Sequence, residues 1–276
     1  MTEQERQKLI DTIKGFCLID DIYFNIYMDG NPQDMQFILR IIENDPGLEV
    51  IDLYTQHEVP NLYGRGVRFD AFVRSTAGVE YNIEVQRDSS GACPERARFN
   101  SSMLDARVVQ KGFKWGKDHL PPAKVIFITE NDALCGGKPL YHVVRVIKEL
   151  DGKRFEDNAE IIYVNANYID DSPLGRLMHD MQCPNPDDMY YTELAERAKY
   201  LKTNEHGVIE MCEAMEKLVN DGVEKGRIEG RTESEQNTIL RLWRKGKSLA
   251  DIMDATDWTG ERINAFLRSR NLQPAQ

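Results

Sequence analysis

The 276-residue sequence lacks any uninterrupted apolar run of the roughly 18 residues that a membrane-spanning helix requires. Its five cysteines lie far apart, are odd in number and form no CxxC pair, which argues against a disulfide scaffold or a zinc ribbon. The N-terminus is polar and mixed in charge, unlike a signal peptide. We therefore expect a cytoplasmic protein with reduced cysteines and no membrane partner.

Other common signatures are missing as well. Gly136-Gly137-Lys138 lacks the GxxxxGK[ST] spacing of a phosphate-binding loop, and the five histidines form no convincing pair of metal ligands. Basic residues are also scarce, because 35 Lys and Arg stand against 46 Asp and Glu, for a net charge of −11. This balance is unfavourable for nucleic-acid binding, which depends on Lys and Arg.

The charge is unevenly distributed along the chain. Residues 65–124 contain 11 basic and 7 acidic residues, so this segment is net positive. The local potential matters more to a charged substrate than the total charge does. A nucleic-acid substrate for this segment therefore stays open.

Within this segment, two β-patterned runs, Val67–Val73 and Glu80–Gln86, flank a short polar break and predict a hairpin. Because alternate strand residues share a face, antiparallel pairing brings Asp70 close to Glu84 and Gln86. Two carboxylates and an amide from neighbouring strands offer hard oxygen ligands, which suit a divalent cation, usually Mg²⁺. The alternative for Asp70 is a hairpin carboxylate paired with Arg68 or Arg87.

The surrounding pattern predicts a mixed sheet with helices. We expect helices at 33–43 and at 95–111, the second capped by Gly112, and strands at 49–59, 124–129 and 160–165. The stretch Tyr141–Val146 is consistent with either a strand or a short helix. This order predicts an α/β sandwich.

The chain length suits one large domain with an appendage. We expect a core with N-terminal helices over 1–172, a helical extension over 173–220, a linker over 221–235 and a helix-turn-helix-like tail over 236–276. In the linker, Gly222, Gly226 and Gly230 recur among charged residues, which favours a solvated, mobile helix.

The tail has Ser248 and Thr259 as candidate N-caps. Three arginines lie on or after its last helix: Arg262, Arg268 and Arg270. Four acidic residues lie nearby in the sequence: Asp251, Asp254, Asp257 and Glu261. DNA contact, oligomerisation and extension of the core are the alternatives for this tail.

Three motifs together resemble the PD-(D/E)XK nuclease family transposases, relatives of the recombination-promoting nucleases. They are Arg68-Phe-Asp70, Tyr81-Asn-Ile-Glu-Val-Gln86 and Arg96-Ala-Arg-Phe-Asn-Ser-Ser102. The similarity extends from about Asp20 to Asp132, through 179–189, and into the glycine-rich linker and tail. It implies a restriction-endonuclease-like core, in which helices flank a mixed sheet, with a helical C-terminal extension.

The resemblance implies a metal-dependent DNA endonuclease linked to recombination or mobile elements. Asp70 and Glu84 would hold Mg²⁺, or Mn²⁺ as an alternative, together with the main-chain carbonyl of Val85. Gln86 occupies the position of the usual catalytic lysine, where its amide would orient water without supplying charge. Phe69 replaces the proline of the motif.

Further residues are candidates for the site. Arg68 is a candidate for nucleic-acid contact, as are Arg96 and Asn100, which fall at helical spacing on one helix. The alternative for the helix is a solvated face, or contact of Arg96 with the carboxylates. Glu43, from the first core helix, is a candidate additional acidic residue, with a surface carboxylate as the alternative.

Three functional hypotheses follow from the sequence. The first is a Mg²⁺-dependent DNA endonuclease. The second is a catalytically weak or inactive DNA-binding or assembly protein that retains the nuclease fold. The third is an RNA-directed nuclease of the same fold. A homo-oligomer is compatible with each of them.

Overall fold

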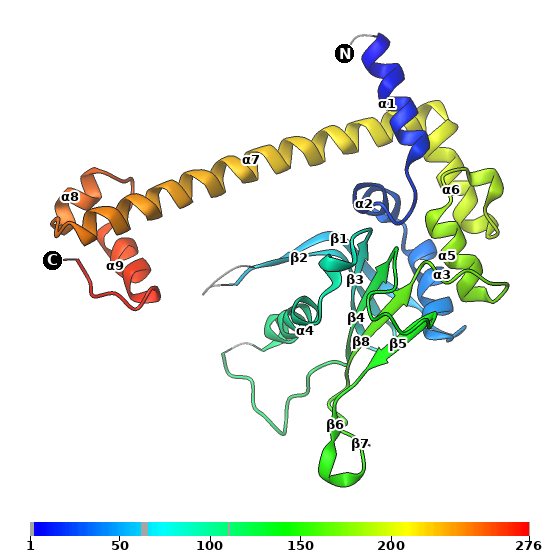
Figure 1. The fold of residues 1–276 in the computed structure, drawn as a ribbon, viewed down its shortest axis with the longest axis horizontal. Helices are drawn as coiled ribbons and strands as arrows, with labels where there is room; N and C mark the ends of the chain where they lie inside the picture. Colours follow the sequence, from blue (N-terminus) through cyan, green and yellow to red (C-terminus); the bar gives the residue numbers. More distant parts are fainter. Residues whose placement is uncertain (1–2, 62–65, 110, 276) are drawn as a thin grey trace. The chain divides into compact units, whose positions relative to one another are not determined.

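The protein is described here by a computed structural model covering residues 3–61, 66–109 and 111–275 (Figure 1). The chain divides into two compact units, Met1–Ala214 and Met215–Gln276. The long helix α7 (Glu205–Arg244) contains the boundary between them. The predicted four-part division stays a prediction, and the boundary between the two units falls within the predicted helical extension.

The first unit is built on a six-stranded mixed sheet with the order β1-β2-β3-β4-β8-β5. The pairs β1–β2, β2–β3 and β5–β8 are antiparallel, whereas β3–β4 and β4–β8 are parallel. The predicted α/β fold with a mixed sheet is confirmed. The strand bounds are β1 Val50–Val59, β2 Val67–Ser75, β3 Glu80–Gln86, β4 Ala123–Thr129, β5 Leu140–Val143 and β8 Ala159–Asn165.

The predicted hairpin is the pair β2–β3. Phe72 lies opposite Asn82 and Ala71 opposite Ile83 in its register. The turn closes with a hydrogen bond of 2.9 Å from the Gly78 N–H to the Ser75 carbonyl oxygen. Gly78 adopts a φ of 76°, which favours glycine over other residues. Local sequence therefore determines which side chains share each face of these two strands.

One face of the sheet is covered by α4 (Pro94–Val108) (Figure 1). Its Ala97, Met103 and Leu104 form a buried cluster with strand residues that include Phe72 and Phe127. The 3₁₀ turn η1 (Ser89–Ala92) leads from β3 into this helix. Because Asn82, Glu84 and Gln86 point to the same face as Phe72, α4 lies over the predicted site.

The opposite face is covered by α2 (Asp21–Met28), α3 (Pro32–Glu43) and α5 (Pro173–Gln182) (Figure 1). Their buried apolar residues face strand residues such as Ile83 and Ile126, which are also buried. The helices α1 (Glu3–Gly15) and α6 (Thr192–Thr203) contact each other, and the turn η3 (Pro186–Asp188) precedes α6. The small pair β6 (Val146–Ile147) and β7 (Lys153–Arg154), with the turn η2 (Lys148–Leu150), forms a separate ribbon.

Several local expectations are corrected. The helix α4 ends at Val108, and Val109 is its C-cap, so Gly112 is not the cap. The sequence reading assigned no helix to 21–28, where the structure has α2. The open alternative at 141–146 resolves as the strand β5 over Leu140–Val143. The predicted linker over 221–235 is helical and lies within the single helix α7, which also includes the end of the predicted extension and the beginning of the predicted tail.

The second unit contains most of α7 together with α8 (Leu249–Asp254) and α9 (Gly260–Ser269). The two predicted N-caps are confirmed, because the Ser248 and Thr259 side chains accept hydrogen bonds from the N–H groups of Asp251 and Arg262. Buried side chains from all three helices form a small core: Ile239, Ile252, Trp258, Ile263 and Leu267, with Ala275 beyond α9.

No helix in the described ranges combines the length and the apolar character needed to span a bilayer.

Candidate active site

The two predicted carboxylates meet where β2 and β3 part. The pairing of the two strands ends at Ala71 and Ile83, and one further step would set Asp70 opposite Glu84. The Asp70 Oδ2 atom accepts a hydrogen bond of 3.0 Å from the Val85 N–H. The Val85 N–H therefore donates to the Asp70 side chain, whereas in a continuous ladder it would donate to a main-chain carbonyl oxygen of β2. Both carboxylates are buried at this point, where the pairing of β2 and β3 ends.

Val85 adds a main-chain oxygen to this edge. The N–H and C=O of one strand residue point toward the same neighbouring strand. Because the Val85 N–H is directed at Asp70, the Val85 carbonyl also faces β2. Three oxygen-bearing groups, from Asp70, Glu84 and Val85, therefore gather at the point of separation.

Glu84 is fully buried and is fixed by two neighbours. Its Oε1 atom accepts a hydrogen bond of 2.8 Å from Asn82, and its Oε2 atom accepts one from the Arg96 guanidinium. Arg96 also donates to the Gly91 carbonyl oxygen at 2.9 Å. Asn82 in turn accepts a hydrogen bond of 2.9 Å from the fully buried Asn100. The helix α4 and the turn before it thus hold the Glu84 carboxylate in one orientation.

The buried carboxylates of Asp70 and Glu84 have too little positive charge near them to balance two negative charges. Burial and the neighbouring Glu84 charge raise the pKa of Asp70 well above its ordinary value. Burial also raises the pKa of Glu84, although the hydrogen bond from Asn82 and the charge of Arg96 oppose this rise. One guanidinium therefore faces two buried carboxylates, and the pair favours an additional positive charge.

These residues fit a divalent cation. The described part of the chain contains no group of three or more His, Cys, Asp or Glu side chains placed to hold a metal ion. However, Mg²⁺ is commonly held by only one or two carboxylates, with waters completing its shell. Because Val85 donates to Asp70 Oδ2, the Oδ1 atom is the oxygen of this carboxylate that would serve as a ligand.

Gln86 lies beside Gly91 and Arg96. A Cβ atom on Gly91 would lie 2.2 Å from Gln86 Oε1 and 3.4 Å from Arg96 Nη1. The first distance is far below van der Waals contact, so only glycine leaves room for the Gln86 amide in this position. The turn after β3 therefore sets the place of the residue that replaces the usual lysine.

The three predicted nucleic-acid contacts occupy different environments. Arg68 is exposed on β2, two residues before Asp70 and on the same face. Arg96 is engaged with Glu84, which agrees with the alternative of carboxylate contact. Asn100 is fully buried behind Asn82, away from solvent. Direct contact of these residues with nucleic acid stays a prediction.

Glu43 is not brought to the site. It binds Lys124, which lies opposite Tyr81 near the beginning of β3, whereas the site lies at the end of that strand. Lys124 also lies 3.7 Å from Glu160 on β8. Glu43 is largely buried in this ion-paired group, so it is neither a site residue nor the surface carboxylate that was the alternative.

Asp21 is the acidic residue that sequence reasoning missed. It lies exposed in the first turn of α2, and its charge contributes to the raised pKa of both Asp70 and Glu84. Its Oδ1 atom accepts a hydrogen bond of 2.6 Å from Asn25. The acidic pair Asp20-Asp21 before an apolar run was an available signal for a helix start.

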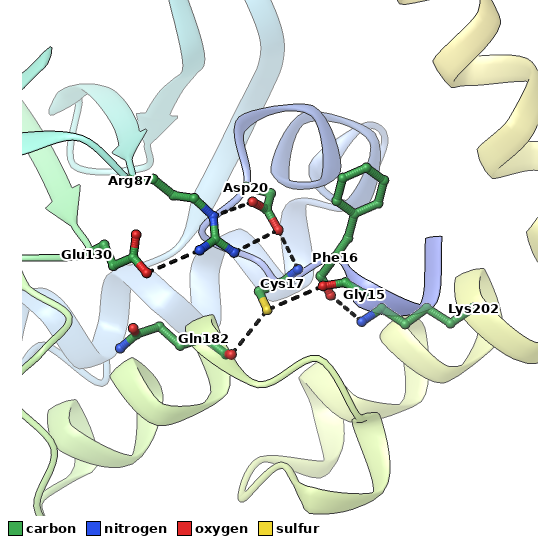
Figure 2. A network of polar contacts seen from close by, with 8 residues as sticks. All are labelled: Gly15, Phe16, Cys17, Asp20, Arg87, Glu130, Gln182 and Lys202. Carbon is green, nitrogen blue, oxygen red and sulfur yellow. Dashed lines mark hydrogen bonds and ion pairs between the residues drawn. The ribbon is translucent and has the colours of Figure 1, made fainter. Parts of the chain in front are cut away.

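A network around Arg87 fixes the beginning of α2 (Figure 2). Arg87, which directly follows Gln86, binds Asp20 and donates to Glu130 Oε1 at 3.1 Å. It therefore joins the ends of β3 and β4 to the residue next to Asp21. Arg87 is committed to these partners, so the alternative pairing of Asp70 with Arg87 is not observed.

The same network continues to α6 (Figure 2). Asp20 Oδ2 accepts a hydrogen bond of 2.7 Å from the Cys17 N–H, and Cys17 Sγ donates to the Gln182 carbonyl oxygen at 3.1 Å. The buried Lys202 ammonium donates to the carbonyl oxygens of Phe16 and Pro184. Burial lowers the pKa of Lys202. These contacts connect the segment before α2 to α5 and α6.

The mixed sheet and the paired carboxylates define a PD-(D/E)XK nuclease-like α/β protein. The family model described as "PD-(D/E)XK nuclease family transposase" matches residues 35–173, just over half of the chain. The chain belongs to this family. Asp70, Glu84, Gln86 and Arg96 lie inside the match, whereas Asp21 and the second unit lie outside it. No curated protein and no solved structure matches the chain.

Proposed function

We propose that this protein is a divalent-metal-dependent endonuclease that cleaves DNA phosphodiester bonds, linked to recombination or mobile elements. The observation that carries the proposal is the buried pair Asp70 and Glu84, for which the described residues supply one ion-paired guanidinium, that of Arg96 on Glu84. A buried like-charge pair is unfavourable in the protein alone, whereas a cation would convert it into a binding site. Membership of a nuclease family supports the reaction class.

In this proposal Asp70 and Glu84 hold Mg²⁺ or Mn²⁺, with the Val85 carbonyl as a further ligand. A bound ion of this kind polarises a phosphoryl oxygen and lowers the pKa of a coordinated water. Asn82 and Arg96 orient Glu84 through the hydrogen bonds described above. Such supporting contacts typically change metal affinity or activity by about 10–100-fold when they are removed.

Gln86 and its neighbours have supporting roles. The Gln86 amide orients the attacking water by donating or accepting a hydrogen bond, and it carries no charge. Arg96 supplies the positive charge nearest to it and keeps Glu84 in place. Arg68, exposed beside Asp70, contacts a phosphate of the bound strand. DNA is the proposed substrate, and RNA is the alternative that the experiment separates.

Nicking of supercoiled plasmid tests this proposal. We expect wild-type protein to nick the plasmid with Mg²⁺ and not with EDTA. We expect Asp70→Asn to lower the rate by about 10³-fold, on the scale expected for removal of one group that stabilises charge in the transition state. Glu43→Gln is the matched control, since it removes a largely buried carboxylate from the other end of the sheet and leaves nicking unchanged. Equal cleavage by Asp70→Asn and wild type would contradict the proposal, and preferential digestion of RNA would reassign the substrate.

A second candidate is a DNA-binding or assembly protein without catalysis. Two observations favour it, because Gln86 stands in place of lysine and Glu84 is already paired with Arg96. It predicts DNA binding without metal and no cleavage with Mg²⁺, Mn²⁺ or any other divalent ion. The plasmid assay with several ions distinguishes it from the first proposal.

A further inference from the structure

The tail of the chain has the opposite charge balance to the rest of the molecule. Residues 236–276 contain seven basic and four acidic residues, a net charge of +3, whereas the whole chain carries −11. The basic residues are Arg241, Arg244, Lys245, Lys247, Arg262, Arg268 and Arg270. Positive charge is therefore concentrated in residues 236–276, the C-terminal part of the second unit, which lies outside the family match.

These seven cations are available to an external ligand. All seven are exposed, and none makes an ion pair with another residue of the described ranges. By contrast, two of the four acidic residues have structural partners. Asp251 completes the capping box of α8 with Ser248, and Asp257 binds Arg231. Asp257 is thus paired with a cation from outside residues 236–276, whereas the charge of Lys247 acts on Asp251 and that of Arg262 acts on Glu235. The net charge of residues 236–276 stays positive.

The helices α8 and α9 follow each other after a short connection and contact each other, which is the outline of a helix-turn-helix unit. The helix α9 buries Ile263 and Leu267 against the core formed with α7 and α8. On α9, Arg262, Ala265 and Arg268 are exposed at intervals of three residues. In helix-turn-helix proteins the second helix of the motif enters the major groove of DNA. The single methyl group of Ala265 leaves room for a base edge between two arginines.

Arg262 is held in place before any ligand binds. Its guanidinium lies over the Trp258 ring, 3.7 Å from the ring centroid. Trp258 donates from Nε1 to Glu235 on α7 at 2.6 Å. Arg262 also lines a cavity of about 250 Å³, together with Arg227, Arg231, Glu235 and Asp257. A guanidinium fixed by stacking loses less freedom when it binds a phosphate.

A second basic group ends α7. Arg241, Arg244 and Lys245 fall within little more than one helical turn, and Lys247 follows in the loop to α8. Exposed cations at such spacing neutralise phosphates, which releases counterions and makes affinity depend on salt. The two basic groups of the tail therefore offer backbone contacts beside the exposed face of α9.

We propose that the second unit binds double-stranded DNA, with α9 in the major groove and the basic end of α7 on the phosphate backbone. This contact is distinct from the site at Asp70 and Glu84, and it does not require a metal ion. It supplies affinity and position on the duplex, whereas the first unit supplies the cleavage chemistry. The tail thereby resolves the conflict between a nucleic-acid substrate and a chain of charge −11.

Fluorescence anisotropy with a short labelled DNA duplex tests the proposal. The full-length Asp70→Asn protein is used in EDTA, so the result is independent of metal and of cleavage. We expect the added substitutions Arg241→Gln, Arg244→Gln and Lys245→Gln to weaken binding at least tenfold. We also expect the slope of log K against log salt to become shallower by about two to three, because each phosphate contact contributes about 0.9.

The matched control replaces three exposed lysines of the first unit, Lys14→Gln, Lys148→Gln and Lys153→Gln, which change the total charge by the same amount. We expect less than a twofold change in affinity. An equal loss in both variants, or no loss in either, would overturn the proposal. Unlabelled RNA hairpins that compete as well as duplex DNA would also overturn it. Circular dichroism melting must show that the tail variant is folded, and an unchanged mass by light scattering excludes self-association as the role of these charges.

Discussion

Two groups of largely buried acidic residues lie against the same sheet, and they differ in their partners. Near the end of β3, the Arg96 guanidinium forms an ion pair with Glu84 and none with Asp70. Toward the other end, Glu43 and Glu160 share Lys124, and Glu160 also lies near His142 and Arg154. The second group is electrostatically balanced by the protein itself, whereas the first is not.

We propose that this difference separates a functional group, Asp70 and Glu84, from a structural one, Glu43 and Glu160. Burial alone does not distinguish them, because each group contains carboxylates that are largely shielded from water. What distinguishes the first group is the supply of positive charge, and its consequence is the raised pKa of Asp70 and Glu84. We therefore expect substitutions in the first group to affect cleavage and those in the second to affect stability.

We expect the largest effect from Asp70→Asn and Lys124→Met, one substitution in each group, which separate loss of cleavage from loss of stability. Asp70→Asn removes cleavage while preserving the fold, because an asparagine oxygen still accepts the Val85 N–H and the like-charge repulsion disappears. Lys124→Met leaves cleavage intact but lowers the free energy of unfolding by about 1–3 kcal/mol, since the largely buried Glu43 carboxylate loses its partly buried partner. Plasmid nicking and urea unfolding measure the two effects. A loss of cleavage in Lys124→Met below its melting temperature would contradict the distinction.

Arg96→Ala is expected to have the next largest effect. It leaves the fully buried Glu84 carboxylate without its cation, and removal of one partner from a buried pair costs about 3 kcal/mol. Adding Glu84→Gln should restore most of the stability, because the unpaired charge is then removed. Thermal unfolding of the single and double variants in EDTA measures this. If the double variant is as unstable as Arg96→Ala, the role of Arg96 is packing on Phe127 rather than charge.

Gly91→Ala tests the placement of Gln86. The added methyl group would meet the Gln86 Oε1 atom at 2.2 Å, so the amide must move. We expect the nicking rate to fall by about 10–100-fold, the range for loss of a supporting contact. Gly47→Ala is the control for a general effect of replacing a loop glycine, because its Cβ would make only an ordinary contact, 3.4 Å from Asp45 Oδ1. An unchanged rate in Gly91→Ala would remove Gln86 from the mechanism.

The pH dependence of stability gives the smallest expected effect. Asp70 and Glu84 have pKa values in the folded protein above the ordinary values of 3.8 and 4.5, so the folded state binds protons more tightly than the unfolded state. Their contribution to stability is therefore most favourable below about pH 4 and decreases as pH rises through the raised values. In EDTA, we expect Asp70→Asn to show a shallower decline of melting temperature with pH. If the melting temperatures of wild type and Asp70→Asn depend on pH in the same way, the claim that Asp70 and Glu84 lack sufficient positive charge is contradicted.

The hairpin and its site were predictable from sequence because they depend on local periodicity. Residues two apart on a strand share a face, and the short connection between β2 and β3 fixes their pairing. This is sufficient to bring Asp70 toward Glu84. The order of strands and helices likewise indicated the mixed sheet.

The contribution of helices to the site was not predictable in the same way. Which of the two acidic residues, Asp21 or Glu43, lies near Asp70 and Glu84 depends on how α2 and α3 cross the sheet. No local pattern in either helix specifies this crossing. Asp21 is placed by the Arg87 network, whose members come from segments more than 40 residues apart in sequence. Similarly, the partner of Arg96 could be narrowed to a carboxylate or a phosphate, but only the fold identifies it as Glu84.

Thermal unfolding with and without divalent cations tests the central claim most directly. A ligand that binds only the folded state at 100 times its dissociation constant stabilises it by about 2.7 kcal/mol. We predict that Mg²⁺ or Mn²⁺ raises the melting temperature of the wild type and of Glu43→Gln. Asp70→Asn and Glu84→Gln should show no such rise. An equal rise in Asp70→Asn, or a rise abolished by Glu43→Gln, would contradict the assignment of the metal site to Asp70 and Glu84.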